Sequence, residues 1–469
     1  MVQRTQHLWL ENAYLSGDWQ SSVRLSINST GNIISISTGH PDVSDERISG
    51  PVIPGIPNVH SHAFQRAAAG LTEKRPPGRQ AGIKDNFWTW RKIIHKFVRR
   101  LTHDDQLAIA SQLYVEMLKA GYTAVGEFHY LHLDPEGNAY NDPCEMSHCV
   151  VGAANRAGIG LTLLPVLYSV GGYGNVRPNK GQRRYMLGVD DCLQIVESLV
   201  KKYRTEDQIQ IGIAPHSLRQ VPAKPLADAL AGFASIDTKG PIHIHIAEQR
   251  SDVDTHIKHI GARPVAWLLD NAEVNSQWCL VHATHMDTRE TKALAATGAV
   301  AGLCPTTEGN LGDGLFPFSE FLDSGGIWGI GSDSHISVSP IEELRWLEYG
   351  QRLIHQSRNV AAPKGGGPTG ARLYRDALAG GAQALSRSVG ALEPGYRADL
   401  LVLDPSHVNF AGLSKDDLLD SLVFSGNINP IQHVMCGGKW VIRNGHHADE
   451  EAIADAYRIT VSRLLDIAL

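Results

Sequence analysis

The sequence lacks the features that mark several classes of protein. Its six cysteines form no CxxC pair and show no disulfide-like spacing, so we expect reduced thiols in a cytosolic protein. No apolar run approaches the roughly 20 residues that are needed to cross a bilayer. The formal net charge is −6, which gives no electrostatic basis for binding nucleic acid or an anionic membrane.

The start of the chain also lacks a targeting signal. Residues 1–25 contain no apolar core followed by small residues, so we expect no signal peptide and a cytoplasmic location. With 469 residues, the chain could form two or three domains of about 150 residues, or one large α/β barrel. Histidine is the abundant functional residue, with 22 copies, and the positions of these histidines are the most informative feature.

Both ends of the sequence have strand-like patterns. Residues 1–52 hold short alternating runs, with STGN in a hairpin position. Similar patterns return late in the chain, in GYRADLLVLD (395–404) and IQHVMCGGKWVIRNG (431–445). We therefore predict one small β-sandwich domain built from residues 1–52 and 388–450, with a C-terminal helix over 451–469.

Residues 53–387 alternate between short apolar runs and amphipathic helical stretches. This rhythm predicts an α/β fold, a (β/α)8 TIM barrel over 53–387. A doubly wound open sheet shares the rhythm, but the number of repeats and the positions of the polar residues favour the barrel. The eight apolar runs are VIPGIPNVHSH, GYTAVGEFHY, GIGLTLLPVLY, IQIGIAPHS, GPIHIHIAE, WCLVHATH, GAVAGLC and IWGIGSDS. Helical segments between them include 191–203, 263–272 and 339–356. Two long irregular segments, 70–90 and 169–188, follow the first and third strands, and loops of that length usually serve function or are disordered.

Acids and histidines recur at the C-terminal ends of the predicted strands, where barrel enzymes hold their chemistry. A single histidine at a strand end is most often a hydrogen-bonded structural residue. Six of the eight strands carry such residues at the same end, which indicates a shared site. These residues are His60 and His62, Glu127 and His129, His216, His245 and Glu248, His282 and His285, and Asp333 and His335.

Several of these side chains suit a metal centre. His60 and His62 lie two residues apart and share one face of a strand. In PIHIHIAEQ, strand parity alone leaves His243 or His245 as a third ligand. His245 is nearer the C-terminal end and is the predicted ligand, with His243 as a buried supporting residue. Asp333 completes three nitrogens and one oxygen, a set that suits Zn2+ and fits Fe2+ equally. No lysine lies near a strand end to form a bridging carbamate, so we expect one ion per subunit.

Two further residues are placed for acid–base work. A metal-bound water has its pKa lowered to about 7, but its proton must still be removed and a leaving group protonated. Glu248 stands three residues beyond His245 and is predicted to collect that proton and carry it to a leaving nitrogen. His282, at the end of the sixth strand, is predicted to assist deprotonation or to steady the oxyanion.

Together these residues resemble the amidohydrolase superfamily. The matching parts are HxH on the first strand, HxxE on the fifth, a histidine on the sixth, SDS on the eighth, and GYRADLLVLD in the small β domain. The HxxE pair and the strand-six histidine, without a bridging lysine, are similar to the mononuclear deaminase branch. The resemblance covers nearly the whole chain. It implies the metal ligands His60, His62, His245 and Asp333, and the catalytic residues Glu248, His282 and Asp333.

A closer resemblance is to the family of formimidoylglutamate deiminases, in NVHSHAFQRAAAGL, FWTWR, YTAVGEFHY, HIHIAEQ, LVHATH, GNLGDG and GSDSH. It implies hydrolysis of N-formimino-L-glutamate to N-formyl-L-glutamate and ammonia in histidine degradation, by a protein that we expect to be a homodimer. CPTTEGN (304–310) and Pro215 in APHSLR depart from the family pattern. Both could alter loop geometry, but neither is expected to touch a predicted site residue. The implied substrate-binding residues are Gln65, Arg91, Tyr130, His216 and Arg219.

The charge of such a substrate agrees with two of these residues. A linear amidine with two carboxylates requires cationic anchors, and Arg219 and Arg91 can each form a forked pair with a carboxylate. Arg91 is equally compatible with a solvated helix arginine, and the aromatic residues around it with the apolar face of a helix. Two other functions stay open, a deaminase acting on an aminopurine or aminopyrimidine ring and a catalytically inactive barrel with a binding role.

Overall fold

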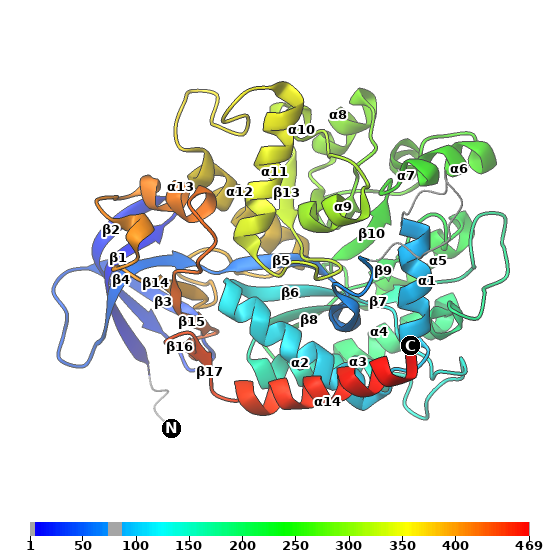
Figure 1. Cartoon of the computed structure of the whole chain (residues 1–469), viewed down its shortest axis with the longest axis horizontal. Helices are drawn as coiled ribbons and strands as arrows, with labels where there is room; N and C mark the ends of the chain where they lie inside the picture. The colour runs from blue at the N-terminus through cyan, green and yellow to red at the C-terminus, as the bar shows by residue number, and fades with distance from the viewer. Residues whose placement is uncertain (1–4, 74–86, 469) are drawn as a thin grey trace.

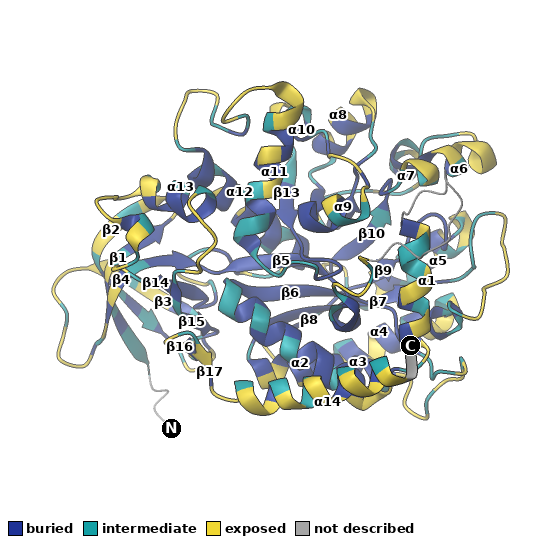
Figure 2. Ribbon diagram, viewed as in Figure 1, coloured by how far each residue is buried: buried dark blue, intermediate teal, exposed yellow. Residues whose placement is uncertain are grey.

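The structure is a computed structural model that describes residues 5–73 and 87–468. A barrel of parallel strands surrounded by helices forms the larger part, and a mostly antiparallel sheet lies beside it (Figure 1). The barrel strands are almost entirely buried, whereas the outer faces of the helices are exposed (Figure 2). The predicted fold class, a (β/α)8 barrel with a small β-sandwich, is confirmed.

The barrel has eight strand positions, one of which is interrupted. β5 to β9 form one hydrogen-bonded sheet and β10 to β13 form another. β8 and β9 both pair with β7 and follow each other in the chain, so together they occupy one position. The bridges Ile213↔Ile242 and Ser61↔Asp333 join the two sheets on both sides and close the barrel. The strands are β5 (Ile56–Ser61), β6 (Tyr122–His129), β7 (Gly160–Leu167), β8 (Ile209–Ile211), β9 (Ala214–Pro215), β10 (Ile242–Ile246), β11 (Trp278–His282), β12 (Val300–Leu303) and β13 (Ile327–Ile330).

The seam of the barrel, where β5 meets the end of β13, lies among the predicted metal ligands. The Asp333 amide donates to the His60 carbonyl oxygen at 3.0 Å, and the His62 amide donates to the Asp333 carbonyl oxygen at 3.3 Å. Gly331 permits this close approach, because a Cβ at that position would lie 2.8 Å from the His60 Cβ. The first and last barrel strands are therefore held together by the backbone of residues whose side chains form the site.

Helices cover the outside of the barrel, and their ends carry clear sequence signals. α2 begins at a capping box in which Thr102 and Asp105 exchange hydrogen bonds, and Gly121 ends it with φ 107°. The three helical segments predicted above are found as α4, α7 and α11. The helices are α1 (Phe87–Val98), α2 (His103–Ala120), α3 (Glu145–Ala157), α4 (Val189–Tyr203), α5 (Ala223–Ile236), α6 (Arg250–Ile260), α7 (Pro264–Asn271), α8 (Thr288–Thr297), α9 (Pro305–Leu311), α10 (Phe318–Asp323), α11 (Pro340–His355) and α12 (Thr369–Leu385).

Strands from both ends of the chain form the second sheet, in the order β17-β16-β15-β14-β4-β1-β2-β3. β4 joins the two ends by antiparallel pairing with β14, with Val52 opposite Val402. Leu10, Leu25 and Leu400 belong to one apolar cluster that is the core of this sandwich. The strands are β1 (Gln6–Leu15), β2 (Asp18–Ile27), β3 (Ile33–Thr38), β4 (Glu46–Pro54), β14 (Leu400–Leu403), β15 (Ile431–Cys436), β16 (Lys439–Arg443) and β17 (His446–His447).

Two helices accompany this sheet. α13 (Asp416–Phe424) lies between β14 and β15, where the sequence pattern predicted strands only, and it packs against α12. α14 (Glu450–Ala468) lies along α2 (Figure 1), where Lys119 and Glu450 form an ion pair at 2.5 Å. Most of the predicted loop 70–90 lies outside the described residues.

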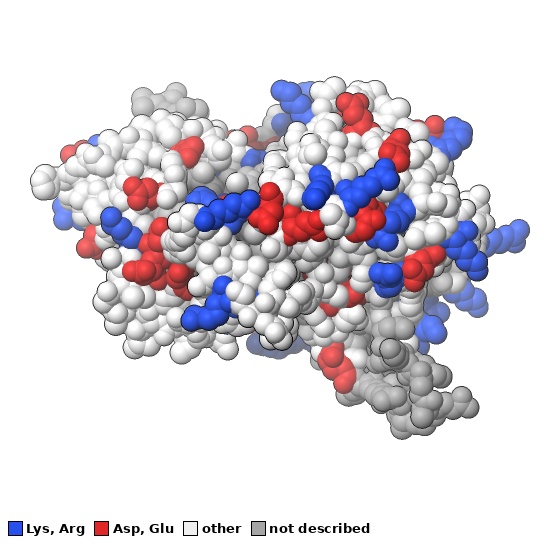
Figure 3. Space-filling view, turned by 90° about the horizontal axis from the view of Figure 1, so that it is seen from above, with Lys and Arg blue, Asp and Glu red and all other residues white. Residues whose placement is uncertain are grey.

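The surface has no strong charge polarity on the face shown in Figure 3, where Lys and Arg side chains are interspersed with Asp and Glu. Within the described part of the chain, no helix combines the length and apolar character that spanning a membrane requires.

Candidate metal centre and active site

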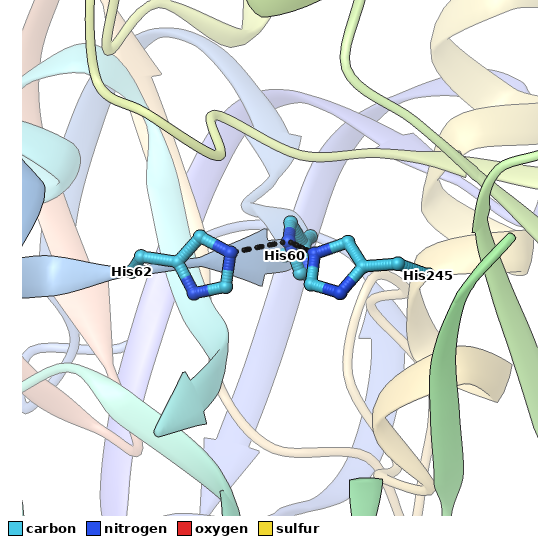
Figure 4. A group of neighbouring side chains, drawn as sticks. All are labelled: His60, His62 and His245. Atoms are coloured by element: carbon cyan, nitrogen blue, oxygen red, sulfur yellow. Dashed lines mark hydrogen bonds between the residues drawn. The ribbon is translucent and has the colours of Figure 1, made fainter. Parts of the chain in front are cut away.

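Three histidine side chains converge at the C-terminal end of the barrel. His60 lies on β5, His62 directly follows β5, and His245 lies on β10. The Nε2 atom of His60 is 3.1 Å from the Nε2 atom of His62 and 3.1 Å from that of His245 (Figure 4). The three rings therefore direct the same kind of nitrogen atom toward one point.

Backbone carbonyl groups fix the tautomers of two of these rings. His62 Nδ1 donates to the Phe128 carbonyl oxygen at 2.9 Å. His245 Nδ1 donates to the His216 carbonyl oxygen at 3.0 Å. Because a carbonyl only accepts, each of these rings presents an Nε2 lone pair to the centre. Burial lowers the pKa of His60, His62 and His245, which keeps the rings neutral. His60 Nε2 can donate one proton at most to two facing lone pairs, so a cation fits this position.

Asp333 adds a carboxylate to the three imidazoles. It follows β13, and its Oδ1 atom lies 3.4 Å from the Nε2 atoms of both His60 and His62. His60, His62 and His245 form one group able to hold a metal ion, and Asp333 belongs to a neighbouring group with His282 and Cys304. Three imidazole nitrogens with a carboxylate beside them suit a divalent metal ion. His243 lies lower on the same strand as His245, where its Nε2 donates to the Ala384 carbonyl oxygen at 2.7 Å. That contact agrees with its predicted role as a buried supporting residue.

Glu248 and His282 stand beside the candidate metal ligands. His282 ends β11, and its Nε2 atom lies 3.9 Å from Glu248 Oε1 and 3.8 Å from Asp333 Oδ2. Its Nδ1 atom lies 3.2 Å from Glu308 Oε1. Burial alone would lower the pKa of His282, but the three neighbouring carboxylates outweigh burial and raise it to about 10. Burial raises the pKa of Glu248 to about 7, so this carboxyl group can gain and lose a proton near neutral pH.

Left-handed backbone conformations occur where the strands turn into the site. Ala247 has φ 52°, His282 has φ 69° and Asp333 has φ 43°. Such conformations cost non-glycine residues roughly 1–3 kcal/mol each and cluster at functional sites. Each of these residues follows or ends a barrel strand, so the turns set the directions in which Glu248, His282 and Asp333 project.

A pocket opens over this group, and the five predicted substrate-binding residues all line it. Gln65 Nε2 donates to the Tyr130 hydroxyl at 3.0 Å. Gln65 Oε1 is buried and has no hydrogen-bond partner among the described residues, so it is available to a donor on a ligand. The Tyr130 ring contacts the His62 ring with centroids 4.9 Å apart, so Gln65 is linked through Tyr130 to one of the candidate metal ligands.

The two pocket arginines have different surroundings. Arg219 is buried, forms an ion pair with Asp252 and lies over the Trp88 ring at 5.2 Å. Arg91, on α1, is half-buried and donates from Nη2 to the Tyr168 hydroxyl at 2.7 Å. Because Arg91 lines the pocket, it is not simply a solvated helix residue. Two guanidinium groups in one pocket suit a ligand with two carboxylates.

Some of the strand-end residues have other surroundings. The Glu127 carboxylate accepts hydrogen bonds from Ser61 Oγ at 2.5 Å and from the Ala63 amide at 2.7 Å, so it supports the end of β5. The His129 ring packs against His132. The expectation that all the strand-end acids and histidines converge on one site was therefore too broad. Neighbouring hydrogen-bond donors and rings outside the site engage some of these side chains. Of the strand-end residues in the described chain, those that do not line the pocket are His60, Glu127, His129, His285 and His335.

Other residues around the site were missed by the sequence pattern. Glu308 lies in CPTTEGN, a segment expected not to touch a predicted site residue, yet its carboxylate contacts His282 at 3.2 Å. Asp252 pairs with Arg219. Both stand on helices, α9 and α6, so a search of strand ends could not find them. Other pocket-lining residues that were not predicted include Trp90, Tyr168, Tyr173 and Tyr185.

Comparison with known proteins agrees with this geometry. The model of the amidohydrolase family matches residues 52–441. The chain belongs to the amidohydrolase family. This amidohydrolase is 47% identical over 459 residues to formimidoylglutamate deiminase of Pseudomonas aeruginosa, an alignment that covers 98% of this chain and 99% of the relative.

Two solved structures share the fold of this amidohydrolase. An amidohydrolase from Brucella melitensis matches with a TM-score of 0.90 and 41% identity, over 98% of this chain and 100% of that one. An adenosine deaminase from Xanthomonas campestris with bound zinc matches with a TM-score of 0.81 and 18% identity, over 98% of both chains. At that identity the second match shows the fold alone.

Proposed function

We propose that this amidohydrolase hydrolyses N-formimino-L-glutamate to N-formyl-L-glutamate and ammonia, as a step of histidine degradation. The observation that carries the proposal is the pocket that Arg91 and Arg219 line together with Glu248 and three of the proposed ligands, His62, His245 and Asp333. A substrate with two carboxylates and an amidine needs both parts of that pocket. The 47% identity to the Pseudomonas aeruginosa deiminase supports the same substrate.

The proposed cofactor is one Zn2+ ion per subunit, with Fe2+ as the other metal that suits the donors. His60, His62, His245 and Asp333 would hold it. When bound, such an ion activates water and polarises the atom under attack. The zinc bound by the Xanthomonas campestris adenosine deaminase supports zinc here only through the shared fold.

Glu248 is the proposed proton carrier. Its raised pKa of about 7 lets its carboxylate accept a proton from the attacking water and then release it to the leaving nitrogen, so ammonia departs neutral. His282, whose pKa is raised to about 10, is charged at neutral pH. It therefore donates a hydrogen bond from Nε2 to the oxygen that becomes negative, rather than removing a proton from water.

The pocket residues are proposed to orient the substrate. Arg91 and Arg219 each bind one carboxylate through their guanidinium groups. Gln65 Oε1, which has no partner among the described residues, accepts a hydrogen bond from the amidine. His216 and Tyr130 line the same pocket and are proposed to hold the formimino group over the reacting centre.

An assay of ammonia release tests this function. The purified, metal-loaded protein is given N-formimino-L-glutamate, N-formimino-L-aspartate, guanine and cytosine in separate reactions. We expect release from the formimino substrates, fastest with glutamate. Release from the ring substrates only would show that the protein is a ring deaminase, and full metal occupancy with no release from any substrate would favour the inactive binding role.

We also propose that the protein works in the cytoplasm as a homodimer. Its six cysteines are free, which suits a reducing compartment. α11 exposes Trp346, Tyr349 and Leu353, and Leu353 is 77% exposed, a row of apolar side chains typical of an interface. Light scattering after gel filtration should give the mass of two chains, and Leu353→Glu should shift it toward one. A monomeric wild type would contradict the proposal.

A further inference from the structure

The Glu308 side chain contacts the edge of the His282 ring that faces away from the pocket. The His282 Nδ1 atom lies 3.2 Å from Glu308 Oε1, and both side chains are buried. The Nε2 atom of the same ring faces Glu248 and Asp333. The ring is therefore held on one edge by a carboxylate and turned toward the reacting centre on the other.

The Glu308 carboxylate is itself fixed in place. Oε1 accepts a hydrogen bond from the Cys304 amide at 3.0 Å, and Cys304 directly precedes α9. α9 is tied to α11 through Thr306, whose hydroxyl and amide donate to the Glu343 carboxylate at 2.5 Å and 2.9 Å. A carboxylate held by these contacts has little freedom to follow a moving imidazole.

The backbone at His282 is strained, and the contact with Glu308 helps to hold it in place. His282 has φ 69° and Ala283 has φ 48°, so two successive residues at the end of β11 are in the left-handed region. Strain of this kind persists only when surrounding contacts hold it. The contact between His282 Nδ1 and Glu308 is one such holding contact. It also determines that Nε2, rather than Nδ1, faces the pocket.

We propose that Glu308 is a positioning residue that orients the His282 ring through its contact with Nδ1, so that Nε2 faces the reacting centre. The proposal deepens the function proposed above and rests on it for the role of His282. Glu308 does not touch the substrate and acts through His282. A purely structural role would require only a hydrogen-bond acceptor at this position, which a glutamine also provides.

The test compares Glu308→Gln with a matched variant of another buried glutamate. Glu348 on α11 is buried and accepts hydrogen bonds from the Val360 and Ala361 amides, so Glu348→Gln makes the same chemical change outside the pocket. We expect Glu308→Gln to lower kcat roughly 10–100-fold, as is usual for outer-shell partners. KM and metal content should stay at wild-type values, while Glu348→Gln leaves kcat unchanged.

A second readout needs no substrate. The His282 Nδ1 proton bonded to a carboxylate should give a far-downfield proton NMR signal that is present in the wild type and in Glu348→Gln. It should be absent in Glu308→Gln and in His282→Asn, and Glu308→Asp should restore part of both the signal and kcat. An unchanged signal and kcat in Glu308→Gln would overturn the proposal, as would a kcat loss matched by loss of metal or by unfolding. If no formimino substrate is turned over, the NMR result still decides the role of Glu308 independently of the proposed function.

Discussion

The site has two halves in which the pKa of a buried histidine is shifted in opposite directions. On the metal side, burial lowers the pKa of His60, His62 and His245. On the acid–base side, His282 is also buried, yet its pKa is raised to about 10. The four rings nevertheless lie in contact, with His60 beside the other three and the His245 and His282 rings stacked 5.6 Å apart.

The difference comes from the partner behind each ring. His62 and His245 donate to backbone carbonyl oxygens, which are neutral and cannot compensate the loss of solvation of a charged ring. His282 has the Glu308 carboxylate behind it and two more carboxylates in front. Neutral partners thus leave lone pairs for a metal, whereas carboxylate partners make a proton donor.

Removing a ligand should have the largest effect, because it breaks the metal side completely. We expect His245→Ala to lose the bound metal and all measurable ammonia release, and to melt at a lower temperature than the wild type. Metal content by elemental analysis and thermal unfolding by circular dichroism give the result. A variant that keeps one ion per subunit would contradict the assignment of His245, and His243→Gln on the same strand serves as the control that keeps its metal.

Changing the proton carrier should break the acid–base side alone. Glu248→Gln keeps the size of the side chain but cannot carry a proton, so we expect kcat to fall about 10³-fold or more. Metal content and melting temperature should remain at wild-type values. Loss of metal from this variant would show that the two halves are not separable, and unchanged turnover would remove Glu248 from the mechanism.

The two pocket arginines test how charged side chains outside the candidate metal group affect substrate binding. Arg219→Met should lower kcat/KM more than Arg91→Met, with roughly 10–100-fold for the larger loss. The reason is that Arg219→Met leaves the Asp252 carboxylate without its ion pair, where it repels a substrate carboxylate. Steady-state kinetics measures both variants. Adding Asp252→Asn to Arg219→Met should recover part of the loss, and no recovery would exclude this explanation.

The smallest effect concerns His243, a ring with a carbonyl partner and no role as a ligand. Burial lowers its pKa from 6.5 to about 4, so the folded state resists its protonation. The stability it contributes is present above pH 6.5 and is lost as the pH falls toward 4. The free energy of unfolding of His243→Gln, measured with urea over that range, should fall less steeply with decreasing pH than that of the wild type. The difference in slope should correspond to about one proton. An unchanged slope in His243→Gln would show that burial beside a carbonyl does not keep this ring neutral.

The sequence predicted the parts of the site that come from regular strands. The eight apolar runs correspond to the barrel strands, and period two placed His60 and His62 together. It could not predict the bond between His282 and Glu308, because that contact joins a strand to a helix and depends on how α9 packs. Nor could the sequence distinguish Glu127 from the site residues. It stands at a strand end as they do, but it accepts hydrogen bonds from Ser61 and Ala63.

The position of the seam also bears on how the chain comes apart. Of the proposed metal ligands, His60 lies on the first barrel strand and Asp333 follows the last one, and the backbones of these two residues bond to each other at this point. An ion shared by their side chains would act as a reversible cross-link across nearly the whole barrel sequence, restricting the unfolded chain much as a disulfide closing a long loop does. Amide exchange at the ends of β5 and β13 would then depend on ligation more than exchange elsewhere in the barrel, and the same ion that serves the reaction would set the order in which the barrel opens.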